Sequence, residues 1–188
     1  MFKKPMLMTA ALATAMMSPV LFAETITLQP NAQWNAFDVD NSVSNSGGLE
    51  WIDLNNDPLK FTFTLTHSAF LDVVDAGIAG DVFNVYANGV LKGQTSAAVN
   101  SYPNGLGTHF DAAWANPNYS HGSFWFQAGT YTVTGLLTTS ALDNSGQAIN
   151  ATVGAVRLDI PAVPEPESVW LMMTGGLLTF IKLRRAKG

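Results

Sequence analysis

Alternation of apolar and polar residues is the strongest pattern in the middle of the chain. Over residues 59–66, two Leu and two Phe alternate with one Lys and three Thr, which predicts a strand with one face on a core and the other in water. The dipeptide Asn88-Gly89 joins two further apolar runs and predicts a β-hairpin, because both central residues of a type I′ turn need positive φ. The same criteria predict strands over 25–28, 34–39, 51–54, 59–66, 70–75, 81–87, 90–92, 123–126, 130–137 and 154–160.

Turn-forming residues separate these runs. Gly, Asn, Asp and Pro recur between them, and no sustained helical apolar period occurs over residues 24–160. The pattern therefore predicts an all-β fold, an antiparallel β-sandwich of the jelly-roll type, with a closed barrel as the alternative. Residues 94–121 form an irregular passage too long for an ordinary connection, so we expect the functional surface there.

The N-terminal segment differs from this middle region. Lys3 and Lys4 precede an apolar stretch over residues 6–17, and the small Ala23 stands before the polar Glu24. This order predicts a secretory signal peptide over residues 1–23, with cleavage after Ala23. The strand-rich region, residues 24–160, is then the length of one domain.

The C-terminal segment, residues 161–188, has the composition of a linker followed by a membrane anchor. Residues 161–167 contain three Pro and predict a stiff spacer, and an apolar run follows over residues 169–183. A helix of about 15 residues rises about 22 Å, less than the roughly 30 Å hydrocarbon layer of a bilayer. The basic residues Arg184, Arg185 and Lys187 predict that this end faces the cytoplasm and that the rest of the chain lies outside.

Three features of this segment carry a family resemblance. The motif Pro164-Glu165-Pro166, the apolar run and the terminal basic cluster follow one another in the order of the PEP-CTERM sorting signal of Gram-negative exported proteins, which the segment resembles. The resemblance implies transient anchoring in the inner membrane and processing near the motif by an exosortase-type enzyme. It also implies a place at the cell surface or outside the cell, often alongside exopolysaccharide and biofilm. It covers the tail alone and implies no activity for residues 24–160.

Charge and cysteine content exclude several classes of function. Residues 24–160 hold three basic and twelve acidic side chains, a net charge of −9 with His neutral. Because a phosphate backbone needs a basic surface, nucleic acid is not an expected partner. An anionic polysaccharide would need a bridging cation. The absence of cysteine excludes disulfides, thiolate metal sites and a Cys nucleophile.

Candidate catalytic groups are few. Glu50 is the one Glu of residues 25–160, whereas glycoside hydrolysis uses two facing carboxylates. His121 and Ser123 are close in sequence, but no Gly-x-Ser-x-Gly motif accompanies them. We therefore expect that the protein is not an enzyme and has no catalytic residues.

Acidic residues raise the question of a calcium site. Asp72, Asp75 and Asp81 flank a Gly-containing turn and form the candidate metal cluster. Residues 38–42 and 53–57 also place oxygen ligands at alternate positions, but both stretches lack the Gly and Glu that complete an EF-hand. The alternative is that these carboxylates cap turns in contact with water. The expectation is that the protein has no cofactor, with calcium as the possible exception. The three histidines, His67, His109 and His121, are scattered along the sequence and give only a weak signal for zinc.

Trp114 and Tyr119, within residues 94–121, are the candidate ligand-binding residues. Their rings could stack on the apolar face of a sugar, and the alternative is that they cap the core. Two functions therefore stay open. One is an exported, non-enzymatic surface or matrix protein linked to exopolysaccharide. The other is a carbohydrate-binding, lectin-like sandwich module that uses the passage 94–121, with or without calcium.

Overall fold

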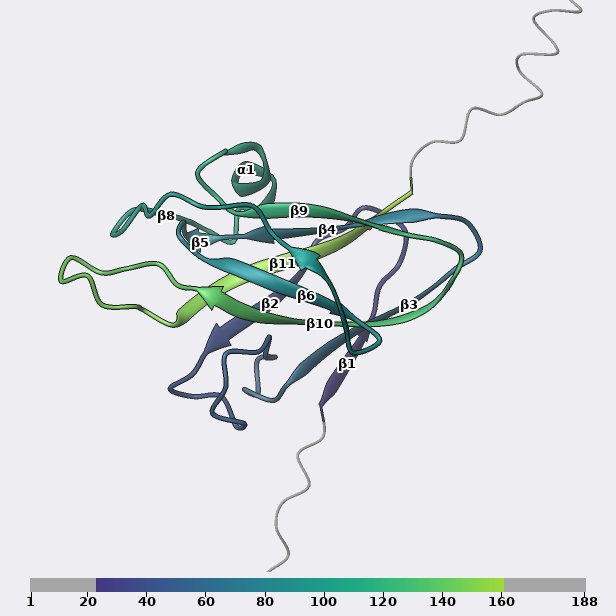
Figure 1. The fold of residues 1–188 in the computed structure, drawn as a ribbon, viewed down its shortest axis with the longest axis horizontal. Coiled ribbons are helices and arrows are strands. Elements are labelled where there is room, and N and C mark those ends of the chain that lie inside the picture. Colours follow the sequence, from purple (N-terminus) through teal and green to yellow (C-terminus); the bar gives the residue numbers. More distant parts are fainter. Residues whose placement is uncertain (1–22, 161–188) are drawn as a thin grey trace, which may run out of the picture.

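Two β-sheets face each other in the computed structural model, which describes residues 23–160 (Figure 1). The five-stranded sheet has the order β1-β3-β10-β6-β7, and the four-stranded sheet has the order β2-β11-β4-β9. A short pair, β5-β8, forms a third sheet. The bounds are β1 Glu24–Thr27, β2 Asn35–Asp40, β3 Leu59–Leu65, β4 Ala69–Asp75, β5 Gly77–Ile78, β6 Val82–Ala87, β7 Val90–Gln94, β8 Gly105–Gly107, β9 His121–Phe126, β10 Gly129–Thr139 and β11 Ala151–Asp159.

The strand order is that of a jelly roll. If β2, β3, β4, β6, β7, β9, β10 and β11 are numbered one to eight, the two sheets read 1-8-3-6 and 2-7-4-5, as two Greek keys give. The all-β prediction is therefore confirmed. One pair departs from the antiparallel pattern, since β1 runs parallel to β3. The strands β1 and β3 can pair in parallel because the chain between them crosses to the other sheet, where it forms β2.

The core fills the space between the two large sheets. In β3 the four alternate apolar residues are buried while the residues between them are exposed or half-buried, as the sequence predicts. Phe37 of β2 stacks on Trp51 with ring centroids 4.2 Å apart, and Phe83 of β6 meets Phe37 edge-on at 5.3 Å. These contacts between the sheets fix their distance, because large rings cannot be displaced without opening a cavity.

The predicted hairpin at Asn88-Gly89 is confirmed. Asn88 and Gly89 have φ of 50° and 78° and connect β6 to β7. The strand predicted over 51–54 is not formed. Ile52 makes isolated bridges to Asp38 and Pro58 only, and Pro58 has no N–H with which to extend the ladder.

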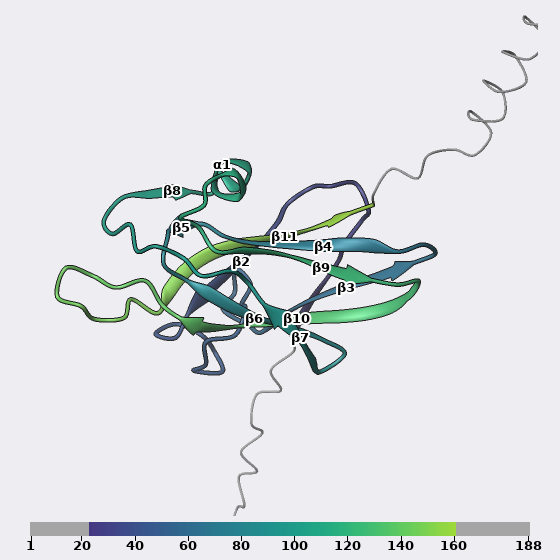
Figure 2. The same cartoon turned by 45° about the horizontal axis from the view of Figure 1, so that its top comes forward.

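The passage 94–121 is more regular than the sequence indicates. It contains β8 and the helix α1, Phe110–Ala115. Figure 2 shows α1 outside the sandwich, on the side of the four-stranded sheet. A second apolar cluster, centred on Val74, Ala113 and Tyr119, packs beneath it. The helix escapes sequence analysis because six residues are fewer than two helical turns.

No helix within residues 23–160 has the length and apolar character needed to cross a bilayer. The predicted sorting segment over 161–188 lies outside the described residues, and so does the predicted signal peptide except for Ala23.

Candidate functional site

The outer face of the four-stranded sheet carries the most distinctive group of side chains. Strand pairing places Arg157 of β11 next to Asp72 of β4, which lies next to Ser123 of β9. The neighbouring row contains Phe70 of β4 beside Trp125 of β9. We call this surface, together with Trp34 and Trp114 at its edge, the aromatic face. Its strand members point away from the core between the two large sheets because side chains alternate between the two sides of a strand, whereas Trp34 and Trp114 also pack against the second apolar cluster.

Arg157 is the centre of the aromatic face. Its Nε donates to Asp72 Oδ2 at 3.0 Å, and Ser123 Oγ donates to the other oxygen, Asp72 Oδ1. The guanidinium carbon lies 4.3 Å from the centre of the Trp34 ring and 5.2 Å from that of Trp114. An arginine suits this position because its planar group can pair with a carboxylate and stack on rings at once.

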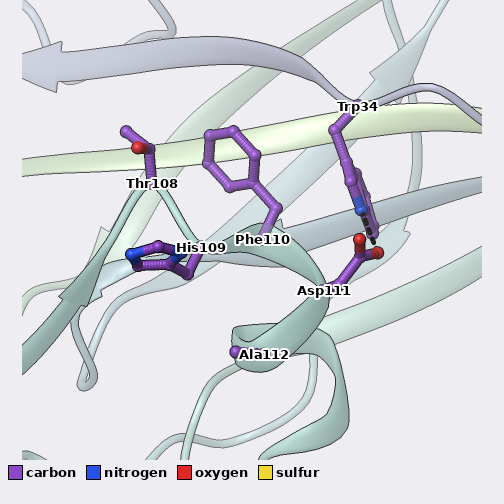
Figure 3. Close-up of a pocket in the computed structure, with 6 residues that line it drawn as sticks. All are labelled: Trp34, Thr108, His109, Phe110, Asp111 and Ala112. Atoms are coloured by element: carbon purple, nitrogen blue, oxygen red, sulfur yellow. Dashed lines mark hydrogen bonds between the residues drawn. The ribbon is translucent and has the colours of Figure 1, made fainter.

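Asp111 connects α1 to the sheet. Trp34 Nε1 donates to Asp111 Oδ1 at 2.7 Å, and the same oxygen lies 3.6 Å from Arg157 Nη1. Figure 3 shows Asp111 directed at the indole nitrogen, with the Phe110 ring on the same side of the helix. An open depression of about 380 Å³ lies here, lined by Trp34, Thr108, His109, Phe110, Asp111 and Ala112.

The two candidate ligand-binding residues belong to the second apolar cluster, in which Tyr119 is buried and against which Trp114 packs, but their surroundings differ. Trp114 is half-buried in the aromatic face, with its ring 5.7 Å from Trp34 and 5.0 Å from His121. Tyr119 is only 3% exposed. Its hydroxyl donates to the Gly77 carbonyl at 3.0 Å and accepts from the Leu106 amide at 3.0 Å. Tyr119 therefore holds β5 and β8 together, and Trp34 takes its place as the neighbour of Trp114.

Trp125 extends the aromatic face toward open solvent. Its side chain is 43% exposed, although it sits in a strand and not in a loop. The Phe70 ring meets it edge-on at 4.9 Å between centroids and orients the indole. Such a supported, exposed ring offers a flat apolar surface to a ligand.

The structure separates the three carboxylates of the candidate metal cluster. Asp72 and Asp75 are three residues apart on β4 and so point to opposite sides of the sheet. Asp72 pairs with Arg157, whereas Asp75 and Asp81 lie together at one end of the sandwich. Within residues 23–160 no three His, Asp or Glu side chains are close enough to hold a metal.

The two other acidic stretches form turns. Asp40 Oδ1 accepts from the Ser42 amide at 2.9 Å, and Asp53 Oδ1 accepts from the amides of Asn55 and Asp57 at 2.7 and 2.9 Å. In these turns the backbone uses the same oxygens that calcium would need, which agrees with the alternative that they cap turns.

The sequence pattern does not mark Trp34, Asp111, Arg157 or Trp125 as site residues. One signal was available, because Arg157 is a charged residue in the predicted strand 154–160, whose other residues are mostly apolar. A charge in such a strand needs a partner on the same face. The partners come from β4 and α1, 85 and 46 residues away, and no local pattern predicts that pairing.

Comparisons with known proteins add little to this geometry. No protein-family model matches the chain, and a search of curated proteins finds no relative. Among solved structures, the pre-peptidase C-terminal domain of a collagenase from Bacillus anthracis is similar with a TM-score of 0.39 and 9% sequence identity, over 76% of this chain and 99% of that chain. Similarity at this level carries no argument about function.

Proposed function

We propose that the chain is an exported, exosortase-sorted protein of the cell surface or matrix, and that residues 24–160 form its non-catalytic binding module. The ligand class is a neutral glycan, such as a segment of exopolysaccharide. The aromatic face favours binding, and the resemblance of residues 161–188 to a sorting signal favours a place outside the cell.

The observation that carries this proposal is the exposed ring of Trp125 on the outer face of the four-stranded sheet, supported by Phe70. Tryptophan is enriched at interfaces because its ring offers an apolar face and its N–H a polar contact. Ser123 and Asp111 are exposed polar residues of the same face and can bond to sugar hydroxyls. Twelve acidic against three basic side chains over residues 24–160 disfavour an anionic polymer.

Glycan binding by the full chain tests the proposal. The wild-type protein is applied to an array of neutral and acidic glycans and to exopolysaccharide of the producing cell, and affinity is then measured by calorimetry. We expect saturable binding to a neutral glycan. Trp125→Ala is expected to weaken it at least tenfold, or about 1.4 kcal/mol, because the stacking surface is lost.

Leu136→Ala is the matched control. Leu136 is also an exposed apolar residue of a strand, 36% exposed, but it belongs to β10 of the other sheet. The Leu136→Ala variant should leave the affinity for the glycan unchanged. A wild-type protein that binds no glycan would contradict the carbohydrate-binding proposal and leave a purely structural role at the surface. Equal loss in both variants would show that the aromatic face is not the site.

A further inference from the structure

Two carboxylates are enclosed at the end of the sandwich where the chain passes between the sheets. Asp75 is the last residue of β4 in the four-stranded sheet, and Asp81 directly precedes β6 in the five-stranded sheet. Their exposed fractions are 0% and 1%. The link between them, residues 76–80, contains β5, and its residues are buried or half-buried.

No basic group neutralises this pair. The side chains within residues 23–160 that are cationic at neutral pH are Lys60, Lys92 and Arg157. Arg157 forms ion pairs with Asp72 and Asp111, and both lysines are exposed. A buried negative charge without a partner is strongly unfavourable. Burial, and after it the negative charge of Asp81, accordingly raises the pKa of Asp75 to about 9.

The hydrogen bonds around the pair leave one oxygen without a partner. Asp75 Oδ2 accepts from the Asp81 amide at 3.3 Å, and Asp75 Oδ1 accepts from Thr152 Oγ1 at 3.4 Å. Asp81 Oδ1 accepts from the Ala141 amide at 2.9 Å. Asp81 Oδ2 is buried and has no hydrogen-bond partner. Buried carboxylate oxygens normally have a hydrogen-bond partner. A buried oxygen without one, next to a second carboxylate, therefore calls for an explanation such as a bound ion.

We propose that Asp75 and Asp81 together bind one divalent cation, and that calcium is the ion that fits best. The donors are oxygens alone, which suit a hard cation and not zinc or copper. The Thr152 hydroxyl lies at Asp75 and can add a neutral ligand. Calcium also accepts irregular arrangements of carboxylate and neutral oxygens, whereas magnesium demands octahedral geometry and keeps several waters.

A divalent cation neutralises the two carboxylates more completely than one shared proton does. One proton cancels one negative charge, whereas one calcium ion cancels both and contacts the free oxygen of Asp81. The ion would also tie the end of β4 to the start of β6, and so one sheet to the other. Calcium is therefore expected to act on stability and not on ligand contacts, since the aromatic face lies on the outer side of the four-stranded sheet.

Thermal unfolding of the full chain, in EGTA and then in calcium chloride at millimolar concentration, tests the proposal. Calcium is expected to raise Tm by about 5 °C or more, because an ion that binds the folded state alone stabilises it by mass action. Magnesium at the same concentration should raise Tm less. Asp81→Asn keeps the size of the side chain and removes its charge. This variant should lose the calcium response and, in EGTA, be at least as stable as the wild type.

Asp40→Asn is the control, since Asp40 belongs to a turn in which the Ser42 amide already occupies its oxygen. It should keep the calcium response. A wild-type Tm that does not respond to calcium would overturn the proposal, and so would a full response in Asp81→Asn. In the alternative of a shared proton, the raised pKa of Asp75 makes stability decline as pH rises from its ordinary value of 3.8 to about 9. Such a decline with no effect of calcium would also overturn it.

Discussion

The ion pair of Arg157 and Asp72 shows how much one residue can depend on another. The Asp72 side chain is only 5% exposed, and that of Arg157 is 18% exposed. Arg157→Leu would leave the carboxylate buried without its cation, so we expect a loss of about 3 kcal/mol in the free energy of unfolding. The double variant Asp72→Val/Arg157→Leu removes both charges and should regain most of that loss. Urea unfolding of the full chain measures both effects.

Lys60→Leu is the matched control for this prediction. Lys60 is a strand residue with the same charge, but it is exposed, so its replacement should change stability by less than about 0.5 kcal/mol. If Arg157→Leu is equally mild, the pair does not hold the aromatic face together. If the double variant is as unstable as the single one, the lost contacts with Trp34 and Trp114 matter more than the unpaired charge.

Which residues meet across the sheet could be predicted only in part. The sequence predicts that Asp72 and Arg157 lie on strands, and alternation settles which face of its own strand each occupies. It does not reveal that β4 and β11 are neighbours, because that pairing joins segments 85 residues apart. The separation of Asp72 from Asp75 has another cause, which alternation alone could have revealed: two residues three apart on one strand point to opposite sides of the sheet.

At the scale of elements, the turn after β10 resembles the one after Trp51. Asp143 Oδ1 accepts from the hydroxyl and the amide of Ser145, both at 2.7 Å, and from the Gln147 amide at 2.9 Å. The bond from the Ser145 hydroxyl, followed by the Gln147 amide, lowers the pKa of Asp143 below its ordinary value. A carboxyl whose pKa is lowered by folding stabilises the fold above its ordinary pKa of 3.8, and this stabilisation is lost as pH falls through the lowered pKa.

Ser145→Ala tests this arrangement. The variant removes the hydroxyl donor, so the pKa of Asp143 should move up toward its ordinary value. Titration of the Asp143 carboxyl carbon by NMR measures the change directly. Ser42→Ala, in the corresponding turn of Asp40, should leave Asp143 unaffected. An identical titration of Asp143 in the wild type and in Ser145→Ala would show that the backbone amides alone set its pKa.

The elements differ in how well the sequence predicts them. The strand β3 is predicted because its alternation reflects one buried face and one that is exposed or half-buried, and β6 is predicted because an apolar run leads into the Asn88-Gly89 turn. The short elements α1 and β8 have no periodicity of their own. They form because Tyr119 and the second apolar cluster hold them against the sheet, and such tertiary contacts leave no local pattern. The stretch 51–54 fails as a strand for a local reason, since the Asp53 carboxylate accepts from the amides of Asn55 and Asp57 and turns the chain back on itself.

At the scale of the whole molecule, the part of the chain that the structure describes begins in one sheet and ends in the other. β1 belongs to the five-stranded sheet and β11 to the four-stranded sheet (Figure 1). All strands of the two large sheets, within the part of the chain that the structure describes, lie between residues 24 and 159. Removal of residues 1–23 and 161–188 is therefore expected to leave the jelly roll and its aromatic face intact.

Processing in the cell tests the proposed route of export. Replacement of Pro164, Glu165 and Pro166 by Ala removes the sorting motif, so the variant should keep its C-terminal segment and stay with the membrane fraction. The wild type should be recovered at a lower mass, without residues 1–23 and without the segment after the motif. Pro161→Ala, a change in the same linker outside the motif, should be processed normally. Intact-mass spectrometry of the recovered proteins distinguishes these forms. A wild-type protein whose mass and location stay the same in a strain without the exosortase would show that the basic end marks an ordinary anchor, because the sorting enzyme would then have no part in its release.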